Sequence, residues 1–178
     1  NILMKLIKKI FFLKVIILFS INNLKAEDKV AYLDIDFILT NTIAGKLLLE
    51  NLKKQEDIKI NKFKIDDEKF RNNEKKILAK KNLVSVEEIK KEMNELQIEY
   101  QKYNNDKKKE IDSLKKKRNT NIINFINSIN PIIEKYMTDN SIYILMDKKN
   151  IFIAKNDYDI TQKLIKLIDN QIKTFEIK

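Results

Sequence analysis

The chain has 178 residues, 35% of them charged, a formal net charge of +10, and neither cysteine nor histidine. It therefore lacks the imidazole base, the thiol nucleophile and the ordinary zinc cluster on which many enzymes depend. A single glycine, Gly45, excludes a glycine-rich phosphate loop. We expect no enzyme activity and no cofactor, and the absence of cysteine also excludes a disulfide framework.

Residues 1–26 have the pattern of a secretion signal. Three lysines precede an apolar run over residues 10–21, and Ala26 provides a small residue for cleavage. The run is shorter than the roughly 20 apolar residues of a bilayer span, and it contains Lys14. We expect export with cleavage after Ala26, and an uncleaved anchor is the alternative.

The positive charge that remains after cleavage is uneven. Removal of residues 1–26 takes five lysines and no acid, so 31 basic and 26 acidic residues leave a net charge of +5. Residues 69–91 and 102–118 each have eight basic and three acidic residues. Residues 27–68, in contrast, have seven basic and ten acidic residues. The candidate contacts to an acidic polypeptide chain or an anionic surface are Lys75, Lys76, Lys80, Lys81, Lys90, Lys91, Lys107, Lys108 and Lys109.

Two other interpretations of this basic surface have to be weighed. Nucleic acid is an ordinary partner of a basic patch, but export argues against it. A solvated coiled-coil face would carry the same charges without binding anything.

Residues 43–130 are predicted to form a helical hairpin. Only Gly45 interrupts this stretch as a possible breaker, and there is no proline in it. Its second half carries apolar residues at the 4, 3, 4, 3 spacing of a coiled-coil seam, namely Ile89, Met93, Leu96, Tyr100 and Tyr103.

The turn of the hairpin is expected near residues 82–85, where Ser85 and Glu88 form a capping box for the second helix. A turn centred on Leu83 brings together residues whose numbers sum to about 166. The apolar pairs are then Ile77 with Ile89, Phe70 with Leu96, Phe63 with Tyr103, Leu52 with Leu114, and Ile43 with Ile123.

This apolar pairing lapses where residues 53–59 face residues 107–113. Ile58 and Ile111 lie there, but neither has an apolar residue opposite. Since little apolar surface is buried by such pairing, we expect a loosely coupled segment that acts as a hinge within the arm.

Residues 27–42 and 131–178 are expected to form a small β-containing base. Residues 142–146 and 151–154 are predicted to form a β-hairpin, with residues 30–35 as a third strand. A base of this size needs partners, so we expect a homo-oligomer. The residues expected to hold the subunits together are Val30, Leu33, Ile35, Ile142, Ile144, Leu145, Ile151 and Ile153.

Two helical features of the base can also be predicted. Pro131 should kink or interrupt the helix near residues 127–130, because it lacks a backbone donor and clashes one turn back. A final amphipathic helix should begin with Asp159 or Thr161 as its N-cap. The fold class is therefore α+β and mainly α: a long antiparallel helical hairpin on a small β-containing oligomerisation base.

Four short motifs resemble the Skp/OmpH family of periplasmic chaperones. Residues 29–34 (KVAYLD) look like the opening strand of the family, and residues 42–46 (TIAGK) resemble the start of its first helix. Residues 141–147 (SIYILMD) look like its second strand, and residues 159–161 (DIT) resemble the start of its last helix. Their order, with a helical hairpin between them, carries the resemblance.

The resemblance implies a homotrimer in which strands from three subunits form a small body and three hairpins project around a cavity. It also implies a periplasmic, ATP-independent holdase for unfolded outer-membrane proteins. The basic arm adds an anionic lipid or lipopolysaccharide surface as a possible partner. A structural or adaptor coiled coil of the cell envelope is the alternative.

Overall fold

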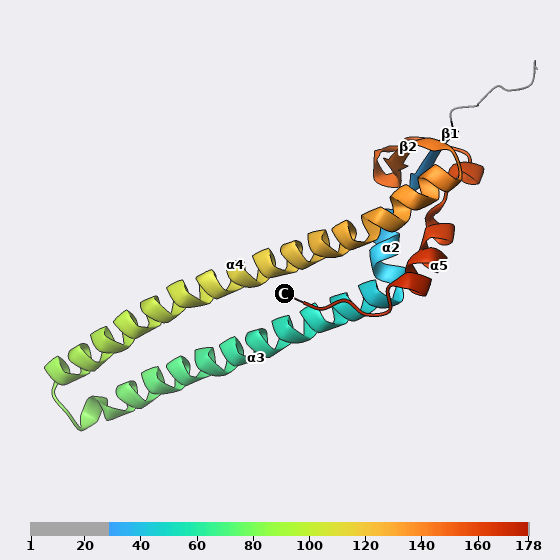
Figure 1. Cartoon of the computed structure of the whole chain (residues 1–178). Helices are drawn as coiled ribbons and strands as arrows, with labels where there is room; N and C mark the ends of the chain where they lie inside the picture. The colour runs from blue at the N-terminus through green and yellow to red at the C-terminus, as the bar shows by residue number, and fades with distance from the viewer. Residues whose placement is uncertain (1–28, 178) are drawn as a thin grey trace, which may run out of the picture.

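The computed structural model describes residues 29–177, so the expected signal peptide lies outside the described residues. A long helical hairpin projects from a small base of short strands and helices (Figure 1). The mainly helical α+β fold expected from the sequence is confirmed. The elements are β1 (Lys29–Leu33), α2 (Ile35–Asn41), α3 (Ile43–Ala79), η2 (Lys80–Asn82), α4 (Val86–Asp139), β2 (Ile142–Asp147), η3 (Lys148–Asn150), η4 (Asn156–Tyr158) and α5 (Thr161–Gln171).

The first helix of the arm, α3, begins at a tight junction with α2. The Thr42 hydroxyl accepts a hydrogen bond from the Gly45 amide at 3.2 Å and donates one to the Ile38 carbonyl at 2.9 Å. A Cβ atom at Gly45 would lie 2.1 Å from the Leu39 carbonyl oxygen. The junction therefore needs glycine because backbone approaches backbone there.

The two arm helices are joined by η2 and a short turn. Leu83 lies in this turn with its side chain exposed, and α4 begins immediately after Ser85. The Ser85 hydroxyl accepts a hydrogen bond from the Glu88 amide at 3.2 Å. This satisfies one of the free donors in the first turn of α4.

The sheet contains two parallel strands, β1 and β2, with Val30 beside Ile144 and Leu33 beside Asp147. The predicted hairpin of residues 142–146 and 151–154 is wrong, since residues 151–154 form no strand within the described chain. The Asp147 carboxylate accepts a hydrogen bond from the Lys149 amide at 3.2 Å, and η3 then directs the chain away from β2.

The predicted third strand over residues 30–35 is shorter than expected. It ends at Leu33, and Ile35 already belongs to α2. The Asp34 carboxylate accepts a hydrogen bond from the Phe37 amide at 2.9 Å, so it caps α2 and stops the strand.

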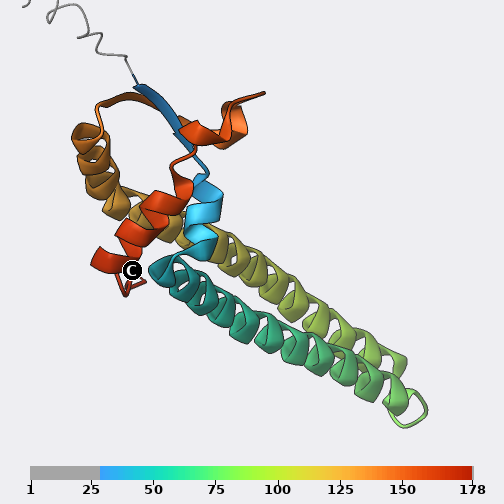
Figure 2. The same ribbon diagram turned by 90° about the vertical axis from the view of Figure 1, so that its right-hand side faces the viewer.

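The sequence predicts that Pro131 kinks or interrupts the helix, and no interruption occurs. Helix α4 runs without a break to Asp139, although its last turns leave the line of the arm (Figure 2). Pro131 and Asn127 both lie on the exposed face of the helix. Because Asn127 is exposed, solvent can replace the donor that its carbonyl loses at Pro131, and this makes the proline tolerable.

The core lies at the junction of the base and the arm. Side chains from α2, the start of α3, the end of α4 and α5 meet there, and Phe125, Ile38, Leu48 and Leu164 are fully buried. Residues 172–177 continue from α5 and turn back beside the start of the arm, where Ile172, Phe175 and Ile177 pack against the core (Figure 1). The ring of Phe175 packs edge to face on Phe125, with their centroids 5.6 Å apart.

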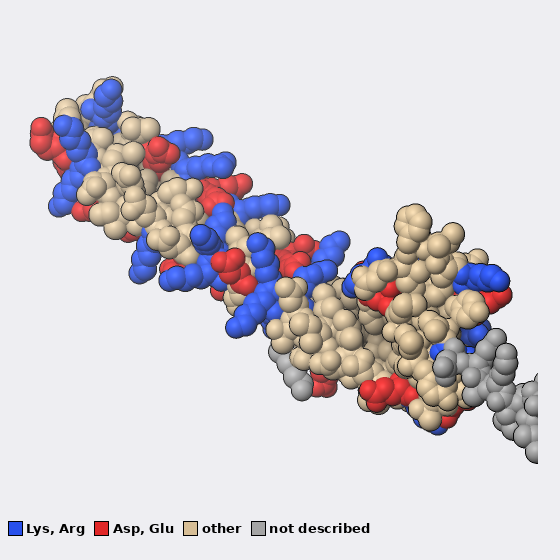
Figure 3. Space-filling view, turned by 90° about the horizontal axis from the view of Figure 1, so that it is seen from above, with Lys and Arg blue, Asp and Glu red and all other residues tan. Residues whose placement is uncertain are grey.

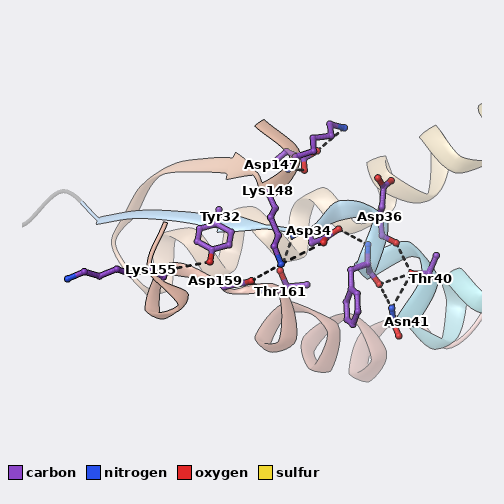
Figure 4. Close-up of polar contacts among 12 residues, drawn as sticks. Tyr32, Asp34, Asp36, Thr40, Asn41, Asp147, Lys148, Lys155, Asp159 and Thr161 are labelled. Atoms are coloured by element: carbon purple, nitrogen blue, oxygen red, sulfur yellow. Dashed lines mark hydrogen bonds and ion pairs between the residues drawn. The ribbon is translucent and has the colours of Figure 1, made fainter. Parts of the chain in front are cut away.

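A polar cluster ties the ends of β1, η3 and α5 together (Figure 4). The Asp34 amide donates to the Thr161 hydroxyl at 2.9 Å, and the Asp159 carboxylate accepts from the Thr161 amide at 2.9 Å. Lys148 Nζ lies 3.7 Å from Asp159 Oδ2 and 4.0 Å from Asp34 Oδ2. The N-cap position of α5 is Ile160, so the prediction of Asp159 or Thr161 is off by one residue. The Asp159 carboxylate nevertheless accepts the hydrogen bond from the Thr161 amide in the first turn of α5.

Candidate functional site: the helical arm and the exposed edge of the base

Hydrogen bonds and ion pairs between α3 and α4 set the register of the arm. The Tyr103 hydroxyl donates to the Phe63 carbonyl at 3.1 Å, which is the pairing expected from the sequence. Lys80 lies 2.8 Å from Glu92. The predicted apolar contact of Ile43 with Ile123 is wrong: these side chains are 43% and 56% exposed.

Where the arm joins the base, other faces of the two helices form the core, next to the faces that carry Ile43 and Ile123. Leu48 of α3 and Phe125 of α4 are fully buried there.

An aromatic cluster holds the middle of the arm. The ring centroid of Phe70 lies 5.2 Å from that of Tyr100 and 5.1 Å from that of Tyr103. The ammonium of Lys107 lies 5.6 Å from the ring centroid of Phe63 and 5.5 Å from that of Tyr103. Such distances allow cation–π attraction in addition to burial of the rings.

The same lysine forms an ion pair across the helices. Lys107 Nζ lies 2.7 Å from Asp67 Oδ2. The hydrogen bond from Lys107 lowers the pKa of the Asp67 carboxyl below its ordinary value, and the same bond raises the pKa of Lys107. Burial raises the pKa of the Tyr103 hydroxyl beside them. The three groups therefore stay in the protonation states that stabilise the arm near neutral pH.

The nine candidate lysines divide into two groups. Lys80 and Lys107 are held by acids of the opposite helix. The others are exposed, and Figure 3 shows basic side chains projecting from both sides of the arm. The exposed members are Lys75, Lys76, Lys81, Lys90, Lys91, Lys108 and Lys109.

Ion pairs between side chains join the two helices in the segment where apolar pairing lapses. Lys59 pairs with Glu110, and Arg118 Nη1 lies 3.6 Å from Glu56 Oε1. The side chain of Ile58 is 59% exposed, so it adds little to the contact between the helices. Hinge motion in this segment stays a prediction.

The eight residues predicted for subunit contacts differ in their exposure, and their role in assembly stays a prediction. Leu33 is buried in the core of its own chain, while Ile144 is exposed and Ile153 is 85% exposed. The side chains of Val30, Ile35, Ile142, Leu145 and Ile151 are half-buried.

The sequence analysis did not select three exposed apolar residues of the base. Phe152 is fully exposed, and Tyr143 and Met146 are exposed on β2. Within the described residues, β2 pairs with β1 on one side only. The consecutive apolar residues Ile151, Phe152 and Ile153 were the available signal, but they were assigned to a strand within one chain.

Two negative findings apply to residues 29–177. No helix among them is both long enough and apolar enough to cross a bilayer. No group of three or more acidic, cysteine or histidine side chains is arranged there to hold a metal ion.

The described geometry defines a class of protein in which a long helical hairpin projects from a small α/β base. The sequence can also be assigned to a protein family. The model of the family described as "Outer membrane protein (OmpH-like)" matches residues 29–168, and the chain belongs to this OmpH-like family. The family resemblance inferred from the four motifs is thereby confirmed.

A solved structure has the same fold. It is a crystal structure of a candidate outer membrane chaperone (OmpH-like) from Caulobacter crescentus CB15, with a TM-score of 0.75 and 16% sequence identity. The match covers 85% of this chain and 89% of that one. No curated protein matches the chain in sequence.

Proposed function

We propose that the protein is an ATP-independent holdase of the periplasm, which binds unfolded outer-membrane proteins and prevents their aggregation. The observation that carries this proposal is an arm on which exposed apolar side chains lie scattered among lysines. The exposed apolar residues of the arm include Ile58, Ile60, Ile65, Leu78, Leu83, Val86 and Ile98.

This surface suits an unfolded chain better than a folded partner. A holdase needs contacts that are individually weak, spread over a large area and tolerant of sequence. Scattered apolar groups and mobile lysine side chains meet that need. By binding the unfolded state, such an arm lowers its free concentration and so slows aggregation by mass action.

The edge of the base supports assembly into a homotrimer. Strand β2 has an unpaired side within the described chain, and Ile144, Phe152 and Ile153 of the base are exposed. Exposed strand edges and apolar patches are normally covered in soluble proteins. Strand pairing between subunits would cover both, and three arms would then surround a client.

The basic surface of the arm also fits an anionic membrane surface. Six of the candidate lysines, between Lys75 and Lys91, lie in the half of the hairpin nearest its turn. Lipid with acidic headgroups, or lipopolysaccharide, is therefore a possible second partner in addition to acidic client chains.

A second candidate function is a structural or adaptor coiled coil of the envelope. The ion pairs of Lys59 with Glu110 and of Arg118 with Glu56 favour it, because they join the helices where apolar pairing lapses. A stiff arm of this kind would recognise one folded partner and ignore unfolded chains.

Light scattering separates the two functions. A denatured β-barrel outer-membrane protein is diluted into buffer with and without the mature chain, and no nucleotide is added. The holdase suppresses scattering at a near-stoichiometric ratio, whereas an adaptor leaves it unchanged. A soluble protein of similar net charge without an arm is the control for non-specific crowding.

A further inference from the structure

The C-terminal segment, residues 172–177, lies against the hairpin as a short peptide would lie in a binding site. It leaves α5 with an extended backbone at Ile172, and it follows the residues that the family model matches, which end at position 168. Beyond Ile172 it forms neither helix nor strand, yet Phe175 and Ile177 pack against the core. The structure therefore shows an irregular stretch of polypeptide docked where the arm joins the base.

Both helices of the arm contribute to the site that receives this segment. The ring of Phe175 packs edge to face on Phe125 of α4, whose side chain is fully buried. Toward α3, Phe175 and Ile177 line an open cavity of about 530 Å³ together with Gln55 and Ile58. The side chain of Ile58 is still 59% exposed, so the site keeps apolar surface that the segment does not cover.

The segment is held by side chains and not by a strand ladder. Among residues 29–177, no backbone–backbone hydrogen bond joins residues 173–177 to another residue. Where main-chain bonds contribute nothing, the affinity and the specificity of a bound peptide both come from its side chains. Another polypeptide with apolar side chains at the same spacing can therefore make the same contacts.

The exposure of the segment alternates along its last four described residues. Thr174 and Glu176 are exposed, whereas Phe175 and Ile177 are half-buried. Alternation of this kind places successive side chains on opposite faces of an extended chain. The strands of outer-membrane β-barrels alternate apolar and polar residues in the same way. Unfolded outer-membrane proteins, which are the proposed clients, thus contain many segments with this pattern.

We propose that this site binds segments of unfolded polypeptide in which apolar and polar residues alternate, and that the C-terminal segment occupies it when no client is present. The segment is then an internal competitor, which an incoming client displaces. The proposal rests on the proposed holdase function for its source of ligand. It assigns the contact to the place where the arm and the base of a single chain meet.

A variant that keeps the whole chain but releases the segment tests the site. In Phe175→Gln/Ile177→Gln, the segment loses the two apolar side chains that line the cavity. The probe is a peptide with the sequence of residues 171–177, with fluorescein at its N-terminus and a blocked C-terminus, and fluorescence anisotropy measures its binding. The double variant should bind the peptide at least about tenfold more tightly than the parent, because the parent fills the site from within at a high effective concentration.

Matched controls exist for the segment, for the peptide and for the wall of the site. Lys173→Gln/Glu176→Gln changes two exposed side chains and should bind the peptide as weakly as the parent. A peptide of the same composition, with its phenylalanine and isoleucines placed next to one another, should bind the double variant at least about fivefold more weakly. Added to the double variant, Ile58→Gln should weaken binding by a similar factor, whereas Ile60→Gln, exposed on the same helix outside the cavity, should not.

Circular dichroism shows whether each variant keeps the helix content of the parent. Ile177→Gln alone keeps the contact of Phe175 with Phe125, so it guards against misfolding of the double variant, and it should also bind the peptide more tightly than the parent. Equal affinity for the peptide in the parent and in both releasing variants would overturn the proposal. Equal affinity for the two peptides would overturn it as well, because the site would then not read the alternating pattern.

The same proteins enter the light-scattering assay with the denatured β-barrel protein. If a client uses this site, the double variant should suppress aggregation at a lower molar ratio than the parent. Suppression by all variants alike, without peptide binding, would reject the site and keep the holdase. Peptide binding without suppression by any variant would keep a peptide site and reject the holdase.

Discussion

Lys107 is the first of three consecutive lysines, yet its ammonium lies against Asp67 and over two aromatic rings. Its neighbour Lys108 points into solvent, since one step along a helix rotates a side chain by about 100°. A run of lysines can therefore contain both residues that face solvent and could bind a partner, and a residue that joins the two helices of the arm. Only the position relative to the opposite helix distinguishes them.

The ion pair of Asp67 with Lys107 should stabilise the arm. Both side chains are about three-quarters shielded from solvent, and Asp67→Asn is expected to lower the free energy of unfolding by about 1 kcal/mol. Lys107→Met tests the same pair, and the double variant should lose less than the sum of the two. Additive losses would show that the pair contributes nothing.

The pair also predicts a pH dependence. Because Lys107 holds the pKa of Asp67 below its ordinary value of 3.8 in the folded state, the stabilisation is complete above 3.8. It is lost as the pH falls through the folded-state pKa. Denaturant unfolding should show a gap between the parent and Asp67→Asn at neutral pH that closes in strong acid.

The second residue whose substitution should change the free energy of unfolding is Gly45. Gly45→Ala would place a methyl group 2.1 Å from the Leu39 carbonyl oxygen, so the junction of α2 and α3 must shift. We expect a loss of about 1–3 kcal/mol in the free energy of unfolding, as for overpacked sites. Lys46→Ala, at the exposed next position, is the control and should unfold like the parent.

At the scale of elements, the two arm helices follow from local signals in the sequence. The absence of breakers and the apolar spacing determine their existence, and the Ser85 hydroxyl marks the start of α4. The elements of the base do not follow in this way. Residues 151–154 have a strand-like composition but no partner strand within the chain, and β-propensity depends on such partners.

The C-terminal segment is an element that the sequence pattern did not reveal. It is too short for a periodic signal, and it is held by contacts such as that of Phe175 with Phe125. Phe175→Ala should raise amide hydrogen exchange at residues 51–58, because the segment packs beside them. The expected loss of local stability is about 1–2 kcal/mol.

Lys173→Ala is the matched control for this segment, since Lys173 is exposed and two positions away. Unchanged exchange at residues 51–58 in Phe175→Ala would show that the segment does not brace the root of the arm.

At the scale of the whole molecule, the exposed edge of the base predicts the effect of a single substitution on assembly. Phe152 is fully exposed in the isolated chain, so Phe152→Asp should leave the fold of one subunit intact. Buried between subunits, the new carboxylate would be unpaired and costly. If the proposed trimer forms through this edge, sedimentation velocity should show Phe152→Asp as a monomer with the helix content of the parent, and a variant that stays assembled would contradict the proposed interface.

The charge of the arm predicts the salt dependence of client binding. Affinity for an acidic unfolded client should fall between about 0.05 M and about 0.5 M salt, because the Debye length shortens over this range. Titration of a labelled client by fluorescence anisotropy measures it. A neutral client is the control and should be less sensitive, and an affinity for the acidic client that does not change with salt would reject the electrostatic contribution.

By itself, the sequence determined the hairpin, its two long helices, its basic surface and, through four short motifs, the OmpH-like family. These features depend on residues close together in the chain. The tertiary structure decided the parallel pairing of β1 with β2, the unbroken passage of α4 through Pro131 and the exposure of Phe152. Each of these depends on what lies opposite a residue in space, and local patterns do not carry that information.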